Sequence, residues 1–201
     1  MFMPPITRLL LITNLAIYLL QQVFSDPLII WFALWPFHTP SSFVSSFQPW
    51  QVITYSFLHG GLIHLGFNML GLYMFGGQIE QVFGAKRFLI YYLGCVFAAA
   101  LTQLAMSALS GGPAVPTVGA SGGVFGLLLA YAMFFPRRMI LLIFPPIPMP
   151  AWLFVTLYGL LELYLGVTST QAGVAHFAHL GGMLGGYILI RQWRRHPPNR
   201  Y

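Results

Sequence analysis

The chain has 201 residues, of which 58% are hydrophobic and 6% are charged, and its formal net charge is +6. Soluble domains carry about a quarter charged residues, so this composition excludes an ordinary soluble protein and predicts a surface that mostly faces the lipid bilayer. The positive charges form small groups between apolar runs, without a basic stretch interleaved with aromatic residues, which argues against nucleic acid as a partner. The length suits a single membrane domain over residues 1–201, with a core of about 8–192 and a basic cytoplasmic tail at 193–201.

Six apolar runs have the length, or nearly the length, of a membrane-spanning helix, which needs about 20 residues. In chain order they cover residues 8–24, 62–83, 88–109, 119–135, 148–166 and 174–192. The first run could also be a signal peptide, but no small-residue cleavage site follows it, so we interpret it as a retained helix. The sequence therefore predicts an all-α membrane protein with a bundle of six transmembrane helices.

Two connections between these runs have an unusual composition. The first, residues 25–61, contains several aromatic residues interrupted by prolines. Since aromatic residues with a polar edge favour the headgroup level, we expect this long outer loop to form short amphipathic elements in the membrane interface. The sequence leaves two roles open for this loop: an interfacial anchor, or a direct part in the chemistry. The 136–150 connection, with five prolines and two arginines, is expected to be a cytoplasmic link.

The lysine and arginine residues predict the orientation of the bundle. All nine of them fall on one side of the six-helix arrangement, because the 25–61, 110–118 and 167–173 connections contain none. Cytoplasmic loops carry an excess of Lys and Arg, so both termini are expected in the cytoplasm. A compact chain of this kind suits a multi-pass protein of the cell membrane, for which we expect the inner membrane of a bacterium.

Two polar residues stand out within the apolar runs, Ser121 in the fourth and His179 in the sixth. A helix rises about 1.5 Å per residue, which puts Ser121 about 22 Å from the inner boundary at Pro136 and His179 about 18 Å from the one at Arg191. Both should therefore lie in the outer half of the bilayer, at similar depth. A hydroxyl buried in hydrocarbon needs a hydrogen-bond partner. We therefore predict that Ser121 and His179 meet inside the membrane as nucleophile and base, in a site open to the outer side.

Small residues near both positions predict close contact between the two helices. Glycines surround Ser121, and Gly182 and Gly186 have the four-residue spacing that lets membrane helices touch. Taken alone, these glycines could equally serve only to pack helices. Phe125 follows Ser121 by four residues and so lies one turn deeper on the same helix face. It is expected either to pack on the His179 ring or to face lipid or the core.

A third element reaches the same level of the membrane. His64 and Asn68 lie four residues apart near the outer end of the second run and therefore share a helix face. A neutral imidazole and an amide can both donate hydrogen bonds to an oxyanion without adding a fixed charge. These two side chains are thus candidates for an oxyanion hole.

The acidic residues do not point to a Ser-His-Asp triad. Asp26 and Glu80 lie near the ends of their helices, and only Glu162, in the fifth run, has a suitable depth. We favour a Ser–His dyad, with Glu162 in a structural hydrogen bond. The single cysteine, Cys95, sits inside an apolar run and is interpreted as a small packing residue.

Three short motifs occur in order on the second, fourth and sixth runs: His64-x-x-x-Asn68, Gly119-Ala120-Ser121-Gly122 and His179-x-x-Gly182. With these motifs the chain, over about residues 8–192, resembles the rhomboid family of intramembrane serine proteases. The resemblance implies that Ser121 is the nucleophile and His179 the general base. It implies an oxyanion hole built from His64, Asn68 and the Ser121 backbone N–H. The implied reaction is hydrolysis of peptide bonds in transmembrane proteins near the outer leaflet, and no cofactor or metal is expected.

The resemblance also bears on neighbouring residues. His59 matches a histidine that is structural in the family's outer loop, and Glu80 matches a glutamate that braces that loop. Where the family has Trp-Arg, this chain has Trp50-Gln51, so ionic bracing by that arginine is absent. His176 shares a helix face with His179 and competes with it for the role of base. Only His179 has the following x-x-Gly spacing, and it is therefore preferred.

Two other classes of protein remain open. One is a catalytically inactive rhomboid-like binding protein. The other is a histidine-lined metal transporter that binds zinc or copper, although no His-Glu-x-x-His motif is present. Its candidate ligands are His59, His64, His176 and His179. For a protease, water must reach Ser121, which predicts a cavity open to the outside beneath the 167–173 loop.

Overall fold

A computed structural model of the protein describes residues 3–37, 46–110, 115–141, 146–168 and 175–195. Its helices and strands are, in chain order, α1 (Pro5–Gln21), α2 (Ser25–Phe32), α3 (Gln51–Thr54), the 3-10 helix η1 (Tyr55–Phe57), α4 (Leu62–Gly71), the π-helical η2 (Leu72–Gly76), α5 (Gly77–Phe83), α6 (Ala85–Ser110), α7 (Ser121–Phe134), β1 (Met139–Leu141), β2 (Pro148–Pro150), α8 (Ala151–Thr168) and α9 (His176–Arg195).

Each of the six apolar runs contains a helix. The second run forms one continuous helix in three parts, because η2 joins α4 to α5. Among the described helices, α6 and α8 are long and apolar enough to cross a membrane, over Ala85–Leu109 and Ala151–Thr168, whereas α1 and α7 are apolar but shorter. The mostly helical fold expected from the composition is therefore confirmed.

The prediction of an all-α protein is wrong in one place, the connection between α7 and α8. Here β1 and β2 pair as a two-stranded antiparallel hairpin. Proline fixes φ and interrupts helices, so this proline-rich connection favours extended backbone over another helical turn. Ile140 is buried against the helices, and the N–H of Ala151 donates to the carbonyl of Arg138 (2.9 Å), so the hairpin is attached to the bundle.

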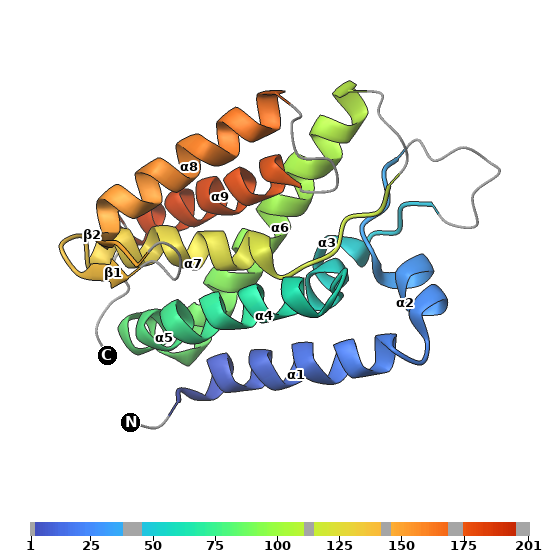
Figure 1. Ribbon diagram of the computed structural model, residues 1–201, viewed down its shortest axis with the longest axis horizontal. Coiled ribbons are helices and arrows are strands. Elements are labelled where there is room, and N and C mark those ends of the chain that lie inside the picture. Colours follow the sequence, from blue (N-terminus) through green and yellow to red (C-terminus); the bar gives the residue numbers. More distant parts are fainter. Residues whose placement is uncertain (1–2, 38–45, 111–114, 142–145, 169–174, 196–201) are drawn as a thin grey trace.

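The long helices lie roughly side by side, with α7 between α4 and α9 (Figure 1). The outer layers are α8, which packs on α9, and α1, which packs on the helix of α4 and α5. The start of α1 and the hairpin lie toward one end of the molecule, whereas α2 and α3 lie toward the other (Figure 1). The N-terminal end of α7, where Ser121 lies, is directed toward the end that carries α2 and α3.

Glycines set how closely α9 approaches α6 and α7. A Cβ atom at Gly182 would overlap the backbone of Gly122 on α7, and one at Gly186 would overlap Tyr91 on α6. Cys95 is fully buried beside Gly186, as expected for a packing residue. The small-residue spacing in the sequence thus corresponds to direct backbone contact between helices.

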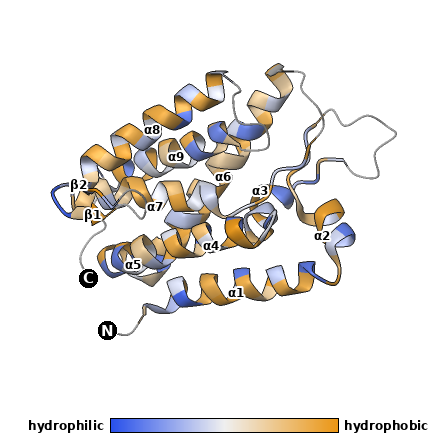
Figure 2. Ribbon diagram, viewed as in Figure 1, coloured by the Kyte–Doolittle hydropathy of each residue, from blue (hydrophilic) through white to orange (hydrophobic). Residues whose placement is uncertain are grey.

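In α1 the polar side faces the bundle and the apolar side faces outward, which is the opposite of a surface helix in a soluble protein. Its polar residues Thr7, Asn14 and Gln21 are buried against the bundle. Its exposed residues include large apolar side chains, namely Leu9, Ile12, Leu15 and Leu19. Figure 2 shows apolar residues along the outward side of both α1 and α8. Apolar surface of this extent is typical of a protein that contacts lipid.

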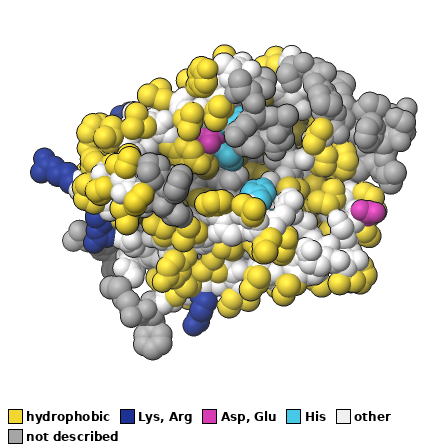
Figure 3. Space-filling model, viewed as in Figure 1, with side chains coloured by type: hydrophobic (Ala, Val, Ile, Leu, Met, Phe, Trp, Pro, Cys, Tyr) yellow, Lys and Arg dark blue, Asp and Glu magenta, His cyan; other side chains and the backbone are white. Residues whose placement is uncertain are grey.

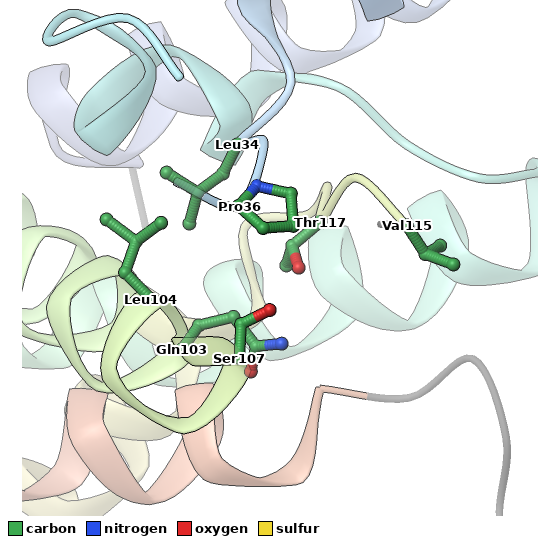
Figure 4. Close-up of a pocket in the computed structure, with 7 residues that line it drawn as sticks. All are labelled: Leu34, Pro36, Gln103, Leu104, Ser107, Val115 and Thr117. Carbon is green, nitrogen blue, oxygen red and sulfur yellow. The ribbon is translucent and has the colours of Figure 1, made fainter. Parts of the chain in front are cut away.

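The segment after α2 is tied to the segment that leads into α7. Leu34 and Thr117 form a β-bridge, with backbone hydrogen bonds of 3.0 and 2.9 Å between them. A small pocket lies between this bridge and α6 (Figure 4). It is lined by Leu34, Pro36, Gln103, Leu104, Ser107, Val115 and Thr117. The bridge holds the first part of the long outer connection against the backbone that precedes Ser121.

Candidate active site

Ser121 begins α7 directly after a tight turn at Gly119. The φ of Gly119 is +126°, a conformation that residues with a side chain rarely adopt. Its N–H donates to the carbonyl of Tyr55 (3.0 Å), and a Cβ atom at this position would lie 2.7 Å from His64 Nε2. Glycine therefore lets this turn run against the His64 ring, which brings the start of α7 beside α4.

Ser121 and His179 are in hydrogen-bond contact. His179 lies in the first turn of α9, and α9 touches α7 where Gly182 meets Gly122. The Ser121 Oγ atom lies 2.8 Å from His179 Nε2, although the two residues are 58 positions apart in the chain. The structure thus brings together the two residues that the sequence analysis paired.

The other ring nitrogen of His179 faces an acid. Glu162 on α8 accepts hydrogen bonds at Oε2 from His179 Nδ1 (2.9 Å) and from His176 Nδ1 (2.7 Å). The Glu162 side chain is buried. We expected this acid to make a structural hydrogen bond. One of its two hydrogen bonds is to the ring of His179 itself, because its turn of α8 packs against the start of α9.

The two histidines of α9 have different surroundings. His176 bonds to Glu162, whereas His179 bonds to both Glu162 and Ser121. Of the two competitors for the role of base, His179 is therefore the one whose ring reaches the serine.

Phe125 lies flat on the His179 ring. The two ring centroids are 4.2 Å apart and the planes differ by only 5°. This is the packing arrangement that the four-residue spacing from Ser121 allowed. Tyr158 on α8 packs against the Phe125 ring, with centroids 4.9 Å apart. His179 is thus held on its face by Phe125 and at its edge by Glu162.

Two polar side chains of α4 line the turn that precedes Ser121. A Cβ atom at Gly119 would lie 2.7 Å from His64 Nε2 and 3.6 Å from Asn68 Nδ2. Asn68 is 5% exposed, and its Nδ2 has no hydrogen-bond partner within the described residues. A buried amide donor without a partner costs about 1–3 kcal/mol, and an acceptor atom supplied by a ligand would offset that cost. Ser121 is the first residue of α7, so its N–H also has no partner within that helix.

Figure 3 shows histidine side chains near the middle of the view, between α8 and α4, with an acidic side chain close to one of them. On the same face, the Lys and Arg side chains lie at the left and along the lower edge. The pocket of Figure 4 is lined by residues other than these. The cavity predicted beneath the 167–173 loop falls mostly on residues outside the described ranges.

Residues 46–195 match the family described as the Rhomboid domain, and this match covers most of the chain. The chain belongs to the rhomboid family. It is 28% identical over 150 residues to rhomboid protease GluP of Bacillus subtilis, 33% over 143 residues to the mitochondrial rhomboid protein 1 of Saccharomyces cerevisiae, and 30% over 128 residues to rhomboid protease GlpG of Klebsiella pneumoniae. These alignments cover 74%, 69% and 63% of this chain and 27%, 40% and 42% of the relatives, so the chain spans less than half the length of these curated relatives.

This rhomboid braces its outer loop with an amide where the family motif has arginine. Gln51 is fully buried, and its Oε1 accepts hydrogen bonds from the backbone N–H groups of Trp35 (3.2 Å) and Gln48 (3.1 Å). Its Nε2 donates to the carbonyl of Trp31 (3.4 Å). Ionic bracing is replaced by neutral hydrogen bonds that tie both parts of the loop together.

The expectation that Glu80 braces the outer loop is wrong. Its two oxygens accept hydrogen bonds from the N–H of Ile6 (2.9 Å) and from the N–H and hydroxyl of Thr7 (2.7 and 2.8 Å). These N–H groups belong to the first turn of α1 and have no partner within that helix, so Glu80 caps α1 instead. His59, expected to be structural, is buried, and its backbone exchanges hydrogen bonds with the Gln21 side chain (2.9 and 3.2 Å).

Proposed function

We propose that this rhomboid is a serine endopeptidase that hydrolyses peptide bonds within transmembrane segments of other membrane proteins, near the outer leaflet. The observation that carries the proposal is the 2.8 Å separation of Ser121 Oγ and His179 Nε2 across the α7–α9 contact. A serine hydroxyl is a weak nucleophile until a base within hydrogen-bond reach accepts its proton. The relatives from B. subtilis and K. pneumoniae are both described as rhomboid proteases, which supports the same activity.

In the proposed mechanism, Ser121 Oγ attacks the carbonyl carbon of the scissile bond while its proton passes to His179 Nε2. The tetrahedral intermediate collapses when His179 returns this proton to the leaving amine, and an acyl-serine remains. Water then attacks the acyl carbon with His179 as base. The acid product leaves, and the Ser121 hydroxyl is restored.

The negative charge on the substrate oxygen needs donors during both steps. We assign this role to the Ser121 N–H and to the side chains of His64 and Asn68, which line the Gly119 turn beside the nucleophile. Asn68 Nδ2, which has no partner within the described residues, is already buried, so little reorganisation accompanies the reaction. Removing one such donor commonly costs about 10²–10³ in kcat.

We further propose that six helices span the membrane: α1, the joined α4–η2–α5 helix, α6, α7, α8 and α9. The 14 residues of α7 rise about 21 Å, which is less than a hydrocarbon core of about 30 Å. The irregular backbone before Ser121 would make up the remaining depth, which is tolerated where protein covers it. With Arg137, Arg138 and both termini on the cytoplasmic side, the site opens to the outer side. A bacterial inner membrane is the location we propose, although one relative is mitochondrial.

The proposed substrates are membrane-spanning segments that contain helix-breaking residues. In a continuous helix each carbonyl is bonded within the segment and its peptide carbon is shielded. A segment that unwinds near the outer leaflet can present an extended peptide to Ser121.

The direct test measures cleavage of a fluorogenic transmembrane peptide by the purified chain in liposomes. The expected result is cleavage by the wild type, loss of at least about 10³-fold in Ser121→Ala, and an unchanged melting temperature. Labelling of Ser121 by a fluorophosphonate should be abolished in His179→Ala. Undiminished cleavage by Ser121→Ala would contradict the proposal, and a folded wild type without cleavage or labelling would favour an inactive binding protein.

A metal-binding function is the second candidate, because Glu162, His176 and His179 place ligand atoms within 4.8 Å of one another. His59 and His64 instead pack ring to ring, with centroids 5.3 Å apart. Tetrahedral zinc with bonds of about 2.0–2.1 Å separates its ligand atoms by about 3.3 Å. The separations of 2.7 and 2.9 Å at Glu162 fit hydrogen bonds better. Stoichiometric zinc in the purified protein would favour the metal-binding candidate.

A further inference from the structure

The environment of Glu162 calls for an explanation that the proposed Ser–His chemistry does not supply. Ionisable side chains within membrane helices are costly and are usually retained for a function. Asp26 lies on α2 and Glu80 caps α1, so Glu162 is the acid of the described residues that reaches the proposed site. Its charge is met there by two imidazole rings rather than by lysine or arginine.

We infer that Glu162 is a positioning residue that completes a Ser121–His179–Glu162 chain of hydrogen bonds, with His176 as a second donor that holds the carboxylate in place. This inference rests on the proposed protease function. Glu162 acts through His179, and it is assigned no contact with substrate.

Glu162 determines the tautomer of His179. An ionised carboxylate only accepts hydrogen bonds, so the nitrogen 2.9 Å from Glu162 Oε2 must carry a hydrogen. In a neutral imidazole the other nitrogen is then an acceptor. That nitrogen is Nε2, which lies 2.8 Å from Ser121 Oγ. Glu162 thus selects the tautomer that can take the serine proton.

Glu162 also stabilises charge that develops during the reaction. When His179 accepts the proton from Ser121, its ring becomes an imidazolium. A carboxylate already bonded to the opposite nitrogen stabilises that positive charge, and the effect is larger in a buried site than in water. Phe125 stacks on the ring face, so the ring cannot rotate away from this line of three groups without losing that contact.

His176 holds the Glu162 carboxylate from a second direction. It lies three residues before His179 on α9, so both rings project from one helix face toward α8. Both Nδ1–H groups meet the same carboxylate oxygen, at 2.7 and 2.9 Å. Without His176 the Glu162 side chain keeps one donor and gains rotational freedom. His176 therefore supports the position of Glu162 rather than that of Ser121.

The kinetic test compares Glu162→Gln with a matched control, Glu80→Gln, which alters the other buried helix carboxylate at a distance from Ser121. A glutamine amide can donate to His179 Nδ1 and so favours the tautomer that cannot accept the serine proton. Since positioned general bases contribute about 10²–10⁴-fold, we expect kcat to fall about 100-fold in Glu162→Gln. KM should change less than about twofold, because Glu162 touches no substrate. Glu80→Gln should keep its rate per folded molecule.

Conservative variants separate positioning from packing. Glu162→Asp restores an acceptor-only carboxylate and should recover kcat to within about tenfold of the wild type. His176→Gln should cost about fivefold in kcat, and no further loss is expected when it is combined with Glu162→Gln. Equal rates for Glu162→Gln and Glu80→Gln, or a loss confined to KM, would overturn the inference.

A readout that does not depend on cleavage distinguishes this inference from the proposed function. Nitrogen-15 NMR of histidine-labelled wild-type protein should show hydrogen on Nδ1 and none on Nε2 of the neutral His179 ring, with the ratio altered in Glu162→Gln. An Nε2–H tautomer in the wild type would overturn the positioning role whether or not the variants fold. The expected tautomer in a protein that never cleaves would instead count against the protease proposal alone.

Discussion

The two buried glutamates of the helix bundle differ in their partners rather than in their burial. Glu80 is 3% exposed and Glu162 is 4% exposed. Glu80 meets backbone N–H groups and a threonine hydroxyl at the start of α1, none of which changes protonation in the accessible pH range. Glu162 meets two imidazoles, one of which also contacts a serine. Burial alone therefore does not identify a functional carboxylate, whereas a titratable partner beside a nucleophile does.

The two glutamates also belong to different helix contacts. Glu80 caps the first turn of α1, and Glu162 lies beside the first turn of α9. Changes at one of these contacts should leave the other intact if one carboxylate is structural and the other takes part in the chemistry.

Asn68→Leu has the largest expected effect on the proposed catalytic site. The variant removes a buried donor that has no partner within the described residues, so little stability should be lost. We expect kcat to fall about 10²–10³-fold through the lost oxyanion contact. Steady-state kinetics would measure this, and a rate within threefold of the wild type would remove Asn68 from the proposed oxyanion hole.

Gly182→Ala separates the two helices that carry Ser121 and His179. The added Cβ would overlap the backbone of Gly122, so α9 must move away from α7. A displacement of about 1 Å can cost about 10²-fold in rate. Gly66→Ala is the matched control, because nothing lies within 4 Å of its Cβ position. Hydrogen exchange at the Thr7 N–H should stay slow in both variants. A loss of protection there would show that the Glu80 contact with α1 is coupled to the α7–α9 contact.

Phe125→Leu should have a smaller effect. The stacked pair at 4.2 Å loses an aromatic contact worth about 0.5–1.5 kcal/mol, and the His179 ring gains freedom. We expect kcat/KM to fall about fivefold, and Phe125→Tyr, which keeps the stack, to stay near the wild type. Equal losses of kcat/KM in both variants would argue that stacking on the face of the His179 ring does not support the rate.

Glu80→Gln should have the smallest effect on activity and a clear effect on stability. Weakening hydrogen bonds to a charged acceptor should lower the free energy of unfolding by about 1.5–3 kcal/mol. Denaturation in mild detergent would measure this loss, while the cleavage rate per folded molecule stays within about twofold. A large drop in that rate would erase the distinction between the two glutamates.

Short-range patterns in the sequence were sufficient for part of the site. The Ser121 and His179 motifs, the glycine spacing of α9 and the four-residue offset of Phe125 depend on helix periodicity, which fixes which residues share a face. The pairing of α7 with α9 also followed, because depth in the membrane can be counted from the charged boundaries.

The contacts of Glu162, Glu80 and Gln51 could not be predicted in this way. Depth estimates placed Glu162 at the right level, but the rotation of α8 about its axis decides whether the side chain faces α9 or lipid. That rotation is set by packing between helices, which leaves no periodic signal in the sequence. The hairpin between α7 and α8 was missed because prolines mark the end of a helix without specifying the strand pairing that follows.

The neutral bracing by Gln51 has a consequence for the membranes in which this protein can work. An exposed arginine–acid contact weakens as salt concentration rises, and anionic headgroups compete for the arginine. A buried amide whose partners among the described residues are backbone groups experiences neither effect. The attachment of the outer loop should therefore be equally firm in zwitterionic and strongly anionic bilayers, and at low and high ionic strength.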